Sequence, residues 1–295
     1  MSFPMTNDRI KFVAEVSSNH NQNIDRCFSF IDKAVEIGCD AVKFQLFKIA
    51  ELFAPEILSK SKEHQKRKDW ELPLLFLPQI AEHCKKRNIE FGCTPFYLNA
   101  VDDLYQYVDF YKIASYELLW NDLLIACAKT EKPIILSTGM ASVDEIKSAI
   151  NILIKSGCKN LTLLHCVSGY PAPINECNLA AIKTLRAIPP ASHFSVGWSD
   201  HSAAPAVIYR AAHCWGAEMI EFHLDLDGTG EEYKTGHCWL PDQIKTVIET
   251  VRSGFQSDGT GKKTPTSSEL PDRDWRADPI DGLRPMKKTR ETFSK

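Results

Sequence analysis

The sequence predicts a (β/α)8 barrel, and three observations support this fold class. Eight short runs rich in Val, Ile, Leu, Phe and Tyr recur along the chain, and helix-like segments separate them. Each run ends in polar residues that can take part in chemistry. The length of 295 residues and the hydrophobic share of 44% suit one barrel with a large core. Because all strands of such a barrel end at one face, these polar residues are expected to meet there.

The eight apolar runs are the predicted strands. In chain order they are Lys11–Ser17, Ala41–Phe47, Ile89–Thr94, Phe110–Ser115, Pro133–Gly139, Leu161–Val167, His193–Ser199 and Met219–Asp225. Their carboxyl ends carry Glu15, Lys43 and Gln45, Thr94, Lys112 and Ser115, Ser137, His165 and Ser168, Ser199 to His201, and then Glu221 and His223. A random scatter of polar residues would not follow strand ends in this way.

Helical periodicity predicts the segments between the strands. They are Ile24–Gly38, Leu74–Asn88, a short one near Tyr97–Tyr107, Asn121–Thr130, Val143–Gly157, Asn178–Ala187, Ser202–Trp215 and Pro241–Phe255. Gly38 and Gly157 follow the last turns of two helices, where a left-handed residue is needed to end the helix. The candidate N-terminal caps are Asp25, Asn121, Ser142 and Asn178.

Two segments interrupt the repeat. Lys48–Pro73 is long and highly charged, which suits a lid, a subunit contact or a solvated surface excursion. We expect residues 1–256 to form the barrel domain and residues 257–295 to form a tail that is partly packed or disordered. Trp275, Leu283 and Met286 indicate that part of this tail packs on something.

Composition excludes several function classes. A formal net charge of −3 gives no bulk attraction for nucleic acid or for an anionic membrane surface. No apolar segment is long enough to span a bilayer. The 10 cysteines are scattered singly, which is typical of reduced thiols, so a cytoplasmic location is the default expectation.

Basic and hydroxyl side chains at the strand ends favour an anionic substrate. Lys43, Lys112 with Ser115, and Ser137 would present cations and hydrogen-bond donors to a small phosphorylated carboxylate. The alternative is a structural ion pair of either lysine with Glu15 or Glu221.

Two histidines form a second group of candidates. His201 and His223 follow neighbouring strands, so both could bind one divalent ion and leave positions open for a substrate oxygen. Such a site polarises a carbonyl group. The alternative is that each histidine is a hydrogen-bonded structural residue.

Short motifs along the chain resemble those of the N-acetylneuraminate (sialic acid) synthases and their nonulosonate-forming relatives. They are Ala14–Asn21, Val42–Gln45, Thr94–Phe96, Tyr111–Ser115, Leu136–Met140, Leu164–Cys166, Tyr170–Pro173 and Gly197–His201. Each motif is weak alone, but their order from about Phe12 to Leu240 is highly specific.

The resemblance implies that phosphoenolpyruvate condenses with the open-chain aldehyde of a 2-acetamido hexose and releases phosphate, with Mn²⁺ or Mg²⁺ in the site. It implies that His201 and His223 are metal ligands and that Glu15 is the acid/base or cation-stabilising carboxylate. The implied phosphoenolpyruvate contacts are Lys43, Thr94, Lys112, Ser115, Ser137 and Ser199. The implied sugar contacts or their supports are Asn19, Gln45, Glu117, Ser168, Tyr170, Asp200 and Glu221.

The chain also departs from that family's pattern. Family members commonly carry a C-terminal antifreeze-like domain that offers an arginine to the partner subunit's sugar site, and we expect this chain to be too short to contain such a domain. The tail arginines that could serve instead are Arg273, Arg276, Arg284 and Arg290. Gln22 stands where Gly is usual, Ser168 where Asn is frequent, and the loop Asp227–His237 differs from the usual stretch. A homodimer through Lys48–Pro73 or the tail is a further expectation.

Three rival functions stay open on the sequence alone. A synthase of the 3-deoxy-octulosonate phosphate type would need a phosphorylated acceptor. A metal-dependent pyruvate aldolase would release no phosphate. A degenerate barrel would bind sugars or a partner without turnover.

Overall fold

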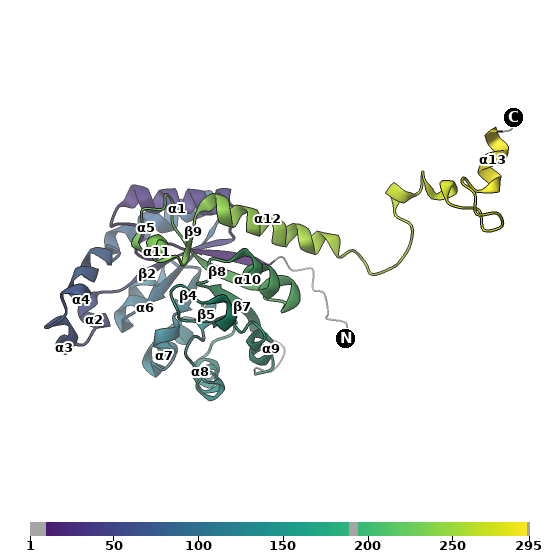
Figure 1. Ribbon diagram of the computed structural model, residues 1–295. Helices are drawn as coiled ribbons and strands as arrows, with labels where there is room; N and C mark the ends of the chain where they lie inside the picture. Colours follow the sequence, from purple (N-terminus) through teal and green to yellow (C-terminus); the bar gives the residue numbers. More distant parts are fainter. Residues whose placement is uncertain (1–9, 189–193, 294–295) are drawn as a thin grey trace. The chain divides into compact units, whose positions relative to one another are not determined.

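The computed structural model describes residues 10–188 and 194–293, and eight parallel strands form a closed barrel with helices around it (Figure 1). The strands are neighbours in chain order, and β1 pairs with β8 to close the barrel. They are β1 (Lys11–Glu15), β2 (Ala41–Leu46), β3 (Glu90–Pro95), β4 (Phe110–Ile113), β5 (Ile134–Ser137), β6 (Leu161–Cys166), β7 (Phe194–Asp200) and β8 (Met219–Leu224). The predicted fold class is confirmed, although the predicted first residue of β7, His193, lies outside the described residues.

The predicted helices lie outside the barrel between the strands (Figure 1). They are α1 (Ile24–Glu36), α5 (Leu77–Arg87) after the 3₁₀ turn η2 (Leu74–Phe76), α6 (Leu98–Tyr105), α7 (Asn121–Lys129), α8 (Val143–Lys155), α9 (Ala181–Arg186), α10 (Pro205–Tyr209), which the π-helical η5 (Arg210–Cys214) extends, and α12 (Pro241–Ser257). No helix in the described ranges is long and apolar enough to cross a membrane.

The expected helix ends are partly confirmed. Gly38 and Gly157 have φ values of +89° and +106° directly after α1 and α8, so they end these helices in the left-handed region. Ser142 forms a capping box at the start of α8. Asp25 lies inside the first turn of α1, and Asn23 is the cap because its extended backbone lets the side chain accept from the amide of Arg26.

Two further predicted caps are wrong. Asn121 is the first residue of α7, and the cap position is taken by Trp120, whose side chain makes no capping hydrogen bond. Asn178 has a φ of +41° and lies before the start of α9. In both cases the helix begins one or more residues away from the position at which the asparagine could cap it.

Strand alternation places an apolar plug inside the barrel. Val13, Ala41, Phe110, Ile135, Leu164 and Met219 form a buried cluster that is separate from the larger core between strands and helices. Two strands carry glycine in the corresponding position. A Cβ on Gly92 would lie 2.1 Å from the ring of Phe110, and one on Gly197 would lie 2.3 Å from the carbonyl oxygen of Met219. Glycine therefore makes room for the large plug residues.

Two residues after each plug position, every strand presents a polar or thiol side chain on the same inner face, because side chains alternate with a period of two. These eight residues, called the floor below, are Glu15, Lys43, Thr94, Lys112, Ser137, Cys166, Ser199 and Glu221. Each is at most 5% exposed.

The structure adds elements that the sequence did not predict. The segment after β2 folds into α2 (Ile49–Leu52), α3 (Pro55–Leu58), α4 (Lys62–Lys66) and the 3₁₀ turn η1 (Arg67–Trp70), and Figure 1 shows the three α-helices grouped at one edge of the barrel. Shorter elements are η3 (Ser115–Glu117), η4 (Ile174–Glu176), α11 (Glu231–Thr235) and β9 (Cys238–Trp239). Strand β9 pairs with β8 through His223 and Cys238, directly beyond the point where the pairing with β7 ends.

A second compact unit begins at Gln256, next to the boundary predicted after residue 256. It contains η6 (Ser267–Glu269), η7 (Arg273–Trp275) and α13 (Lys287–Phe293). Within it, the buried carboxylate of Asp278 accepts from the amides of Ile280 and Lys287. Trp275 is 50% exposed, so its own unit covers only part of the indole.

Candidate active site

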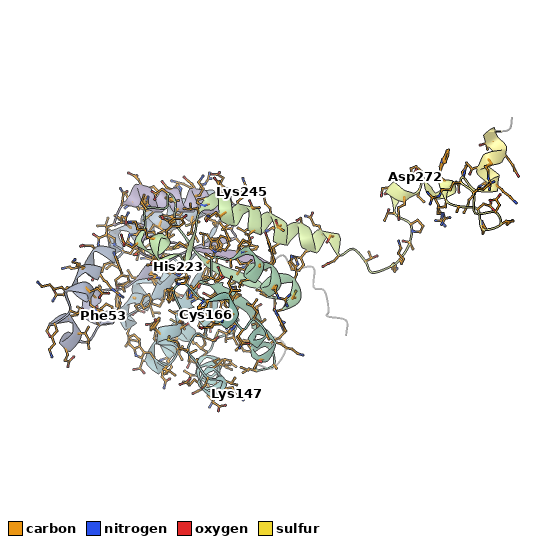
Figure 2. All side chains as sticks on the ribbon, viewed as in Figure 1. Phe53, Lys147, Cys166, His223, Lys245 and Asp272 are labelled. Carbon is orange, nitrogen blue, oxygen red and sulfur yellow. The ribbon has the colours of Figure 1, made fainter. Side chains whose placement is uncertain are left out.

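The floor forms the base of a cavity of about 680 Å³ at the carboxyl ends of the strands. All eight floor residues line it. Figure 2 labels Cys166 and His223 near the middle of the barrel unit, Lys147 on the outer helix α8, and Phe53 in the segment after β2. The fold therefore brings residues from all eight strands to one place, which a barrel does at this end.

Four charged groups of the floor form one buried network. The ammonium group of Lys43 pairs with Oε2 of Glu15, lies 3.1 Å from the hydroxyl of Thr94 and lies 3.9 Å from Oε2 of Glu221. The ammonium group of Lys112 lies 3.5 Å from Oε1 of Glu221. Strand register explains the contact between Glu15 and Lys43, which are direct neighbours across β1 and β2. Two positive and two negative charges balance one another before any substrate binds.

Burial and the ion pairs shift the pKa values of this network in opposite senses. Burial lowers the pKa of Lys43 to about 8, although Glu221 opposes the shift. Burial alone would raise the pKa of Glu221, but the ammonium groups of Lys112 and Lys43 and the hydroxyl of Ser199 hold it well below its usual value. Near neutral pH, Lys43 is therefore mostly cationic and Glu221 is anionic.

Buried hydroxyl groups at or just beyond the ends of β5 and β6 keep hydrogen-bonding capacity for a ligand. The hydroxyls of Ser137 and Ser168 are buried, and within the described residues neither has a hydrogen-bond partner. The hydroxyl of Ser115 accepts from the amide of Gly139 at 3.0 Å. A Cβ on Gly139 would lie 2.3 Å from the hydroxyl of Ser168, so only glycine allows this close approach. Unsatisfied buried hydroxyls are costly, which indicates that a polar ligand belongs here.

The two predicted metal ligands lie next to each other at one side of the floor. The ring centroids of His201 and His223 are 5.3 Å apart, and the ring of Tyr170 lies 4.2 Å from that of His201. Nδ1 of His201 lies 2.8 Å from the carbonyl oxygen of Val167, which orients this ring. Nδ1 of His223 lies 2.8 Å from Oε2 of Glu232. Both imidazoles are thus held by a hydrogen bond at one nitrogen.

Most predicted site residues line the cavity, including Gln45, Glu117 and Tyr170. Burial raises the pKa of Glu117 to about 7. Among the described residues that line the cavity, three predicted ones are missing: Asn19, Ser168 and Asp200. The amide of Asn19 donates to the carbonyl of Leu224 at 3.1 Å, and Asp200 accepts from two indoles, those of Trp198 and Trp239.

The upper wall of the cavity comes from segments that carry no strand pattern. From the segment Lys48–Pro73, the side chains of Leu52, Phe53, His64, Arg67 and Trp70 line it. From the segment after β8, Glu232 and His237 do so. We call these seven residues the rim. The interpretation of Lys48–Pro73 as a cover of the catalytic face therefore has structural support, but its contacting residues were not predicted.

Arg67 is the central cation of this rim. Its guanidinium lies 5.6 Å from the ring centroid of Phe53 and 5.4 Å from that of Trp70. Its closest carboxylate contact is 3.9 Å, to the largely exposed Glu63. Its buried Nε has no hydrogen-bond partner among the described residues. The guanidinium is thus placed by aromatic rings and keeps hydrogen-bonding capacity for a ligand.

A barrel that buries two ammonium groups, two carboxylates and two imidazoles around one cavity defines an enzyme that acts on a small anionic molecule. Residues 30–263 match the NeuB family. The chain belongs to this family.

Named relatives agree with this assignment. The N,N′-diacetyllegionaminic acid synthase of Campylobacter jejuni is 37% identical over 272 residues, which cover 87% of this chain and 80% of the relative. An uncharacterized protein of Methanocaldococcus jannaschii is also 37% identical, over 87% of this chain and 74% of its own length. The crystal structure of N-acetylneuraminic acid synthetase from Leptospira borgpetersenii, in complex with citrate, has a TM-score of 0.79 and 30% identity, and the match covers 94% of this chain and 95% of that one.

Proposed function

We propose that this enzyme condenses phosphoenolpyruvate with the open-chain aldehyde of an N-acyl hexosamine-type sugar, and so forms a nonulosonic acid and inorganic phosphate. The observation that carries this proposal is the floor, where two buried ammonium groups line one cavity together with the buried hydroxyl of Ser137, which has no hydrogen-bond partner within the described residues. Cations and free hydroxyl donors suit a phosphate and a carboxylate on one small molecule. Membership of the NeuB family supports the same reaction.

The floor binds phosphoenolpyruvate through Lys43 and Lys112. Glu221 lies within 3.9 Å of Lys43 and 3.5 Å of Lys112, so it holds both ammonium groups in place before the substrate enters. The further contacts in this proposal are Thr94, Ser115, Ser137 and Ser199, as the family resemblance implies. Fixed donors of this kind orient the enol carbon toward the second substrate without later reorganisation.

The reaction balances with one water molecule. The methylene carbon of phosphoenolpyruvate attacks the aldehyde carbon, a C–C bond forms, and the aldehyde oxygen takes up a proton. Positive charge then develops at the former enol carbon, and water adds there with loss of a proton. The bond between this carbon and the phosphate oxygen then breaks, the proton of the new hydroxyl group passes to the leaving phosphate, and the keto acid remains.

Glu15 is the group that we assign to the developing positive charge and to the attacking water. Its Oε1 accepts from the amide of Ser17 at 2.7 Å, and its Oε2 pairs with Lys43. The carboxylate is therefore fixed and almost fully buried, at 1% exposure. A fixed charge in a water-poor site stabilises a transition state strongly.

His201 and His223 are the proposed ligands of a divalent ion, Mn²⁺ or Mg²⁺. The residues fit such an ion, because the rings are 5.3 Å apart and Val167 and Glu232 each hold one ring at Nδ1. Within the described residues, Nε2 of each ring makes no hydrogen bond. When bound, the ion would polarise the aldehyde and offset the negative charge of the substrate.

The acceptor sugar is the less defined half of the proposal. The sugar end of the cavity is assigned to Gln45, Glu117 and Tyr170 together with the rim. The synthases of Campylobacter and Leptospira are named for different nonulosonic acids, so the family alone does not select the sugar. We also propose a cytoplasmic location, which the ten free thiols support, and homodimer formation, which sedimentation would check.

A phosphate-release assay tests this function. The full chain would be incubated with phosphoenolpyruvate, Mn²⁺ or Mg²⁺, and a panel of N-acylated hexoses, with phosphorylated acceptors as a parallel arm. We expect release that depends on an unphosphorylated N-acyl sugar. Release only with a phosphorylated acceptor would indicate the 3-deoxy-octulosonate phosphate type, and an aldol product without phosphate would indicate a pyruvate aldolase. No turnover with any acceptor would contradict the proposal.

A further inference from the structure

Four side chains with metal-binding atoms lie together above one side of the floor. They are His223 on β8, Glu232 on α11, His237 directly before β9, and Cys238 at the start of β9. One donor atom of each lies within 4.8 Å of the donor atoms of the other three. We call them the four-donor group.

The carboxylate of Glu232 is the centre of this group. Its Oε2 lies 2.8 Å from Nδ1 of His223, 3.7 Å from Nε2 of His237 and 3.6 Å from the sulfur of Cys238. His237 and Cys238 are only 6% and 3% exposed. Two imidazole nitrogens and one thiol sulfur thus surround one carboxylate oxygen in a largely enclosed place.

The backbone explains why these residues meet. Helix α11 ends at Gly236, whose φ of +93° turns the chain back on itself. The next two residues are His237 and Cys238, and Cys238 pairs across the sheet with His223. Ladder pairing and the turn therefore hold the donors near one another through the fold itself, so little reorganisation is needed to bind an ion.

The chemistry of the donors selects the ion. A thiolate, two imidazoles and a carboxylate are the ligand types of tetrahedral zinc sites, with bond lengths of about 2.0–2.3 Å. Mg²⁺ prefers oxygen ligands in octahedral geometry and does not suit sulfur. We propose that His223, Glu232, His237 and Cys238 bind one thiophilic divalent cation of the Zn²⁺ class. This goes beyond the proposed reaction, because it concerns cation binding by the resting protein.

The proposed site shares His223 with the pair of His201 and His223, but its other three ligands are different. Within the described residues, His201 makes no hydrogen bond to any member of the four-donor group, and its Nδ1 faces the carbonyl oxygen of Val167. In this proposal Nδ1 of His223, the nitrogen that Glu232 contacts, belongs to the four-donor group, whereas Nε2 belongs to the pair with His201. Without a cation, burial and the carboxylate of Glu232 raise the pKa of the Cys238 thiol, so a bound cation must displace its proton.

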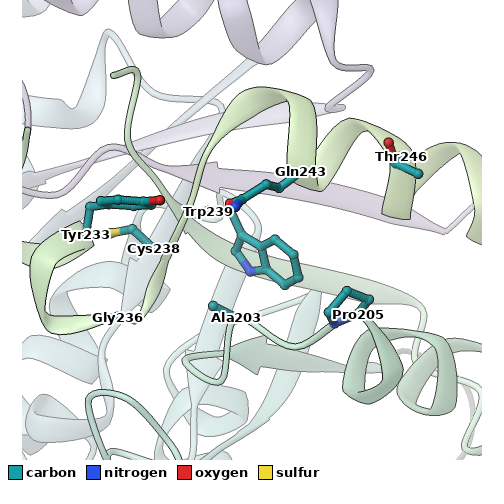
Figure 3. Close-up of a pocket in the computed structure, with 8 residues that line it drawn as sticks. All are labelled: Ala203, Pro205, Tyr233, Gly236, Cys238, Trp239, Gln243 and Thr246. Atoms are coloured by element: carbon teal, nitrogen blue, oxygen red, sulfur yellow. The ribbon is translucent and has the colours of Figure 1, made fainter. Parts of the chain in front are cut away.

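Members of the four-donor group line two cavities. His223, Glu232 and His237 line the cavity above the floor. Cys238 lines a second cavity of about 580 Å³ that lies between α10, α11 and α12. Figure 3 shows Cys238 and Tyr233 at one end of this second cavity, with the indole of Trp239 between Gln243 on α12 and the residues Ala203 and Pro205.

Cobalt spectroscopy on the full chain tests the proposal. Metal-free protein would be titrated with Co²⁺ in the absence of substrates, and Zn²⁺ would then displace the Co²⁺. We expect one equivalent with tetrahedral ligand-field bands and a thiolate-to-cobalt charge-transfer band. Cys238→Ser should remove the charge-transfer band, and His237→Ala should weaken Co²⁺ binding at least about tenfold.

The matched controls are His201→Ala and Cys166→Ser. Cys166 is the other buried thiol near an imidazole, at 3.8 Å from Nδ1 of His201. We expect both controls to keep the charge-transfer band. Loss of the band in Cys166→Ser, its survival in Cys238→Ser, or its absence from the native wild-type protein would each overturn the proposed site.

This readout separates the site from the proposed reaction. An inactive protein that binds Co²⁺ through Cys238 would support the four-donor site and remove the condensation reaction. An active protein without the charge-transfer band would support the condensation reaction and contradict the four-donor site. Circular dichroism of every variant would confirm that it is folded.

Discussion

The floor and the rim of the cavity are built in different ways. Every floor residue stands on a strand, two positions beyond an apolar or glycine plug position, and is at most 5% exposed. The rim residues come from short helices and turns after β2 and β8, where Arg67 and Glu232 keep 35% and 19% of their side chains exposed. A floor that is fixed by strand register can carry chemistry common to a family, whereas a rim made of irregular segments can vary without disturbing the barrel.

The difference between the floor and the rim predicts that mutations in the two regions impair different functions of the enzyme. Changes in the floor should reduce turnover or the use of phosphoenolpyruvate. Changes in the rim should alter the use of the sugar. Changes elsewhere should alter stability alone.

The largest effect is expected for Glu15→Gln. The amide keeps the size of the side chain but removes the charge that we assign to the transition state, so kcat should fall by about 10³-fold or more. Phosphate release gives kcat, and calorimetry gives the dissociation constant of phosphoenolpyruvate, which should change far less. A Glu15→Gln variant with nearly wild-type kcat would show that Glu15 does not have this role, and it would contradict the claim that the floor performs the chemistry.

A second test uses pH. Lys43 has a pKa of about 8, and an ammonium group is charged only below its pKa. Raising the pH through 8 therefore removes a binding cation, and kcat/KM for phosphoenolpyruvate should fall about tenfold per pH unit above it. In Lys43→Arg the guanidinium stays charged, so this alkaline limb should move to higher pH even if the maximal rate is lower. An identical alkaline limb in both proteins would show that another group causes it.

Arg67→Ala sharpens the comparison from the side of the rim. Loss of a guanidinium that lies near the rings of Phe53 and Trp70 should raise KM for the acceptor sugar about tenfold, which corresponds to about 1.4 kcal/mol. KM for phosphoenolpyruvate should stay within about twofold. Arg87→Ala is the matched control, because Arg87 lies on the outer helix α5 and pairs there with Asp32. Equal changes in KM for the acceptor sugar and for phosphoenolpyruvate would contradict the assignment of the two substrates to the rim and the floor.

The smallest effect is expected at the outer helix α8. Ser142→Ala removes a capping box and should lower stability by about 1 kcal/mol and Tm by about 2–4 °C. The steady-state constants should not change. Ser148→Ala, at an exposed position within the same helix, should leave Tm unchanged or slightly higher. A loss of activity in Ser142→Ala would show that the site depends on distant packing.

The predictability of the two regions differs for the same physical reason. A period of two places Glu15, Lys43 and Lys112 on the inner face once the strands are recognised, so seven of the eight floor residues were among the predicted site residues. Cys166 was not, because a single cysteine next to apolar residues is read as a small buried hydrophobe. The structure places its thiol beside His201.

The rim offered no comparable pattern. Helix α11 has five residues and β9 has two, which is too short for any periodicity to show. Arg67 and His64 stood in a run of charged residues that gave no sign of which side chains face the cavity. Conversely, Asn19 was predicted from a family motif to be a sugar contact or its support, but it does not line the cavity. Its side-chain amide donates to the backbone carbonyl of Leu224. Backbone hydrogen bonds of this kind follow from tertiary structure and not from spacing.

A crystal structure of the full chain with phosphoenolpyruvate is the most direct test of the central claim, which is that the floor is a preformed cradle for this substrate. We predict density for the molecule between the ammonium groups of Lys43 and Lys112, with the hydroxyls of Ser137 and Ser199 in contact and the carboxylate of Glu15 facing the enol carbon. Phosphoenolpyruvate bound only at the rim, or lysines that keep their carboxylate partners and leave the molecule untouched, would contradict the account.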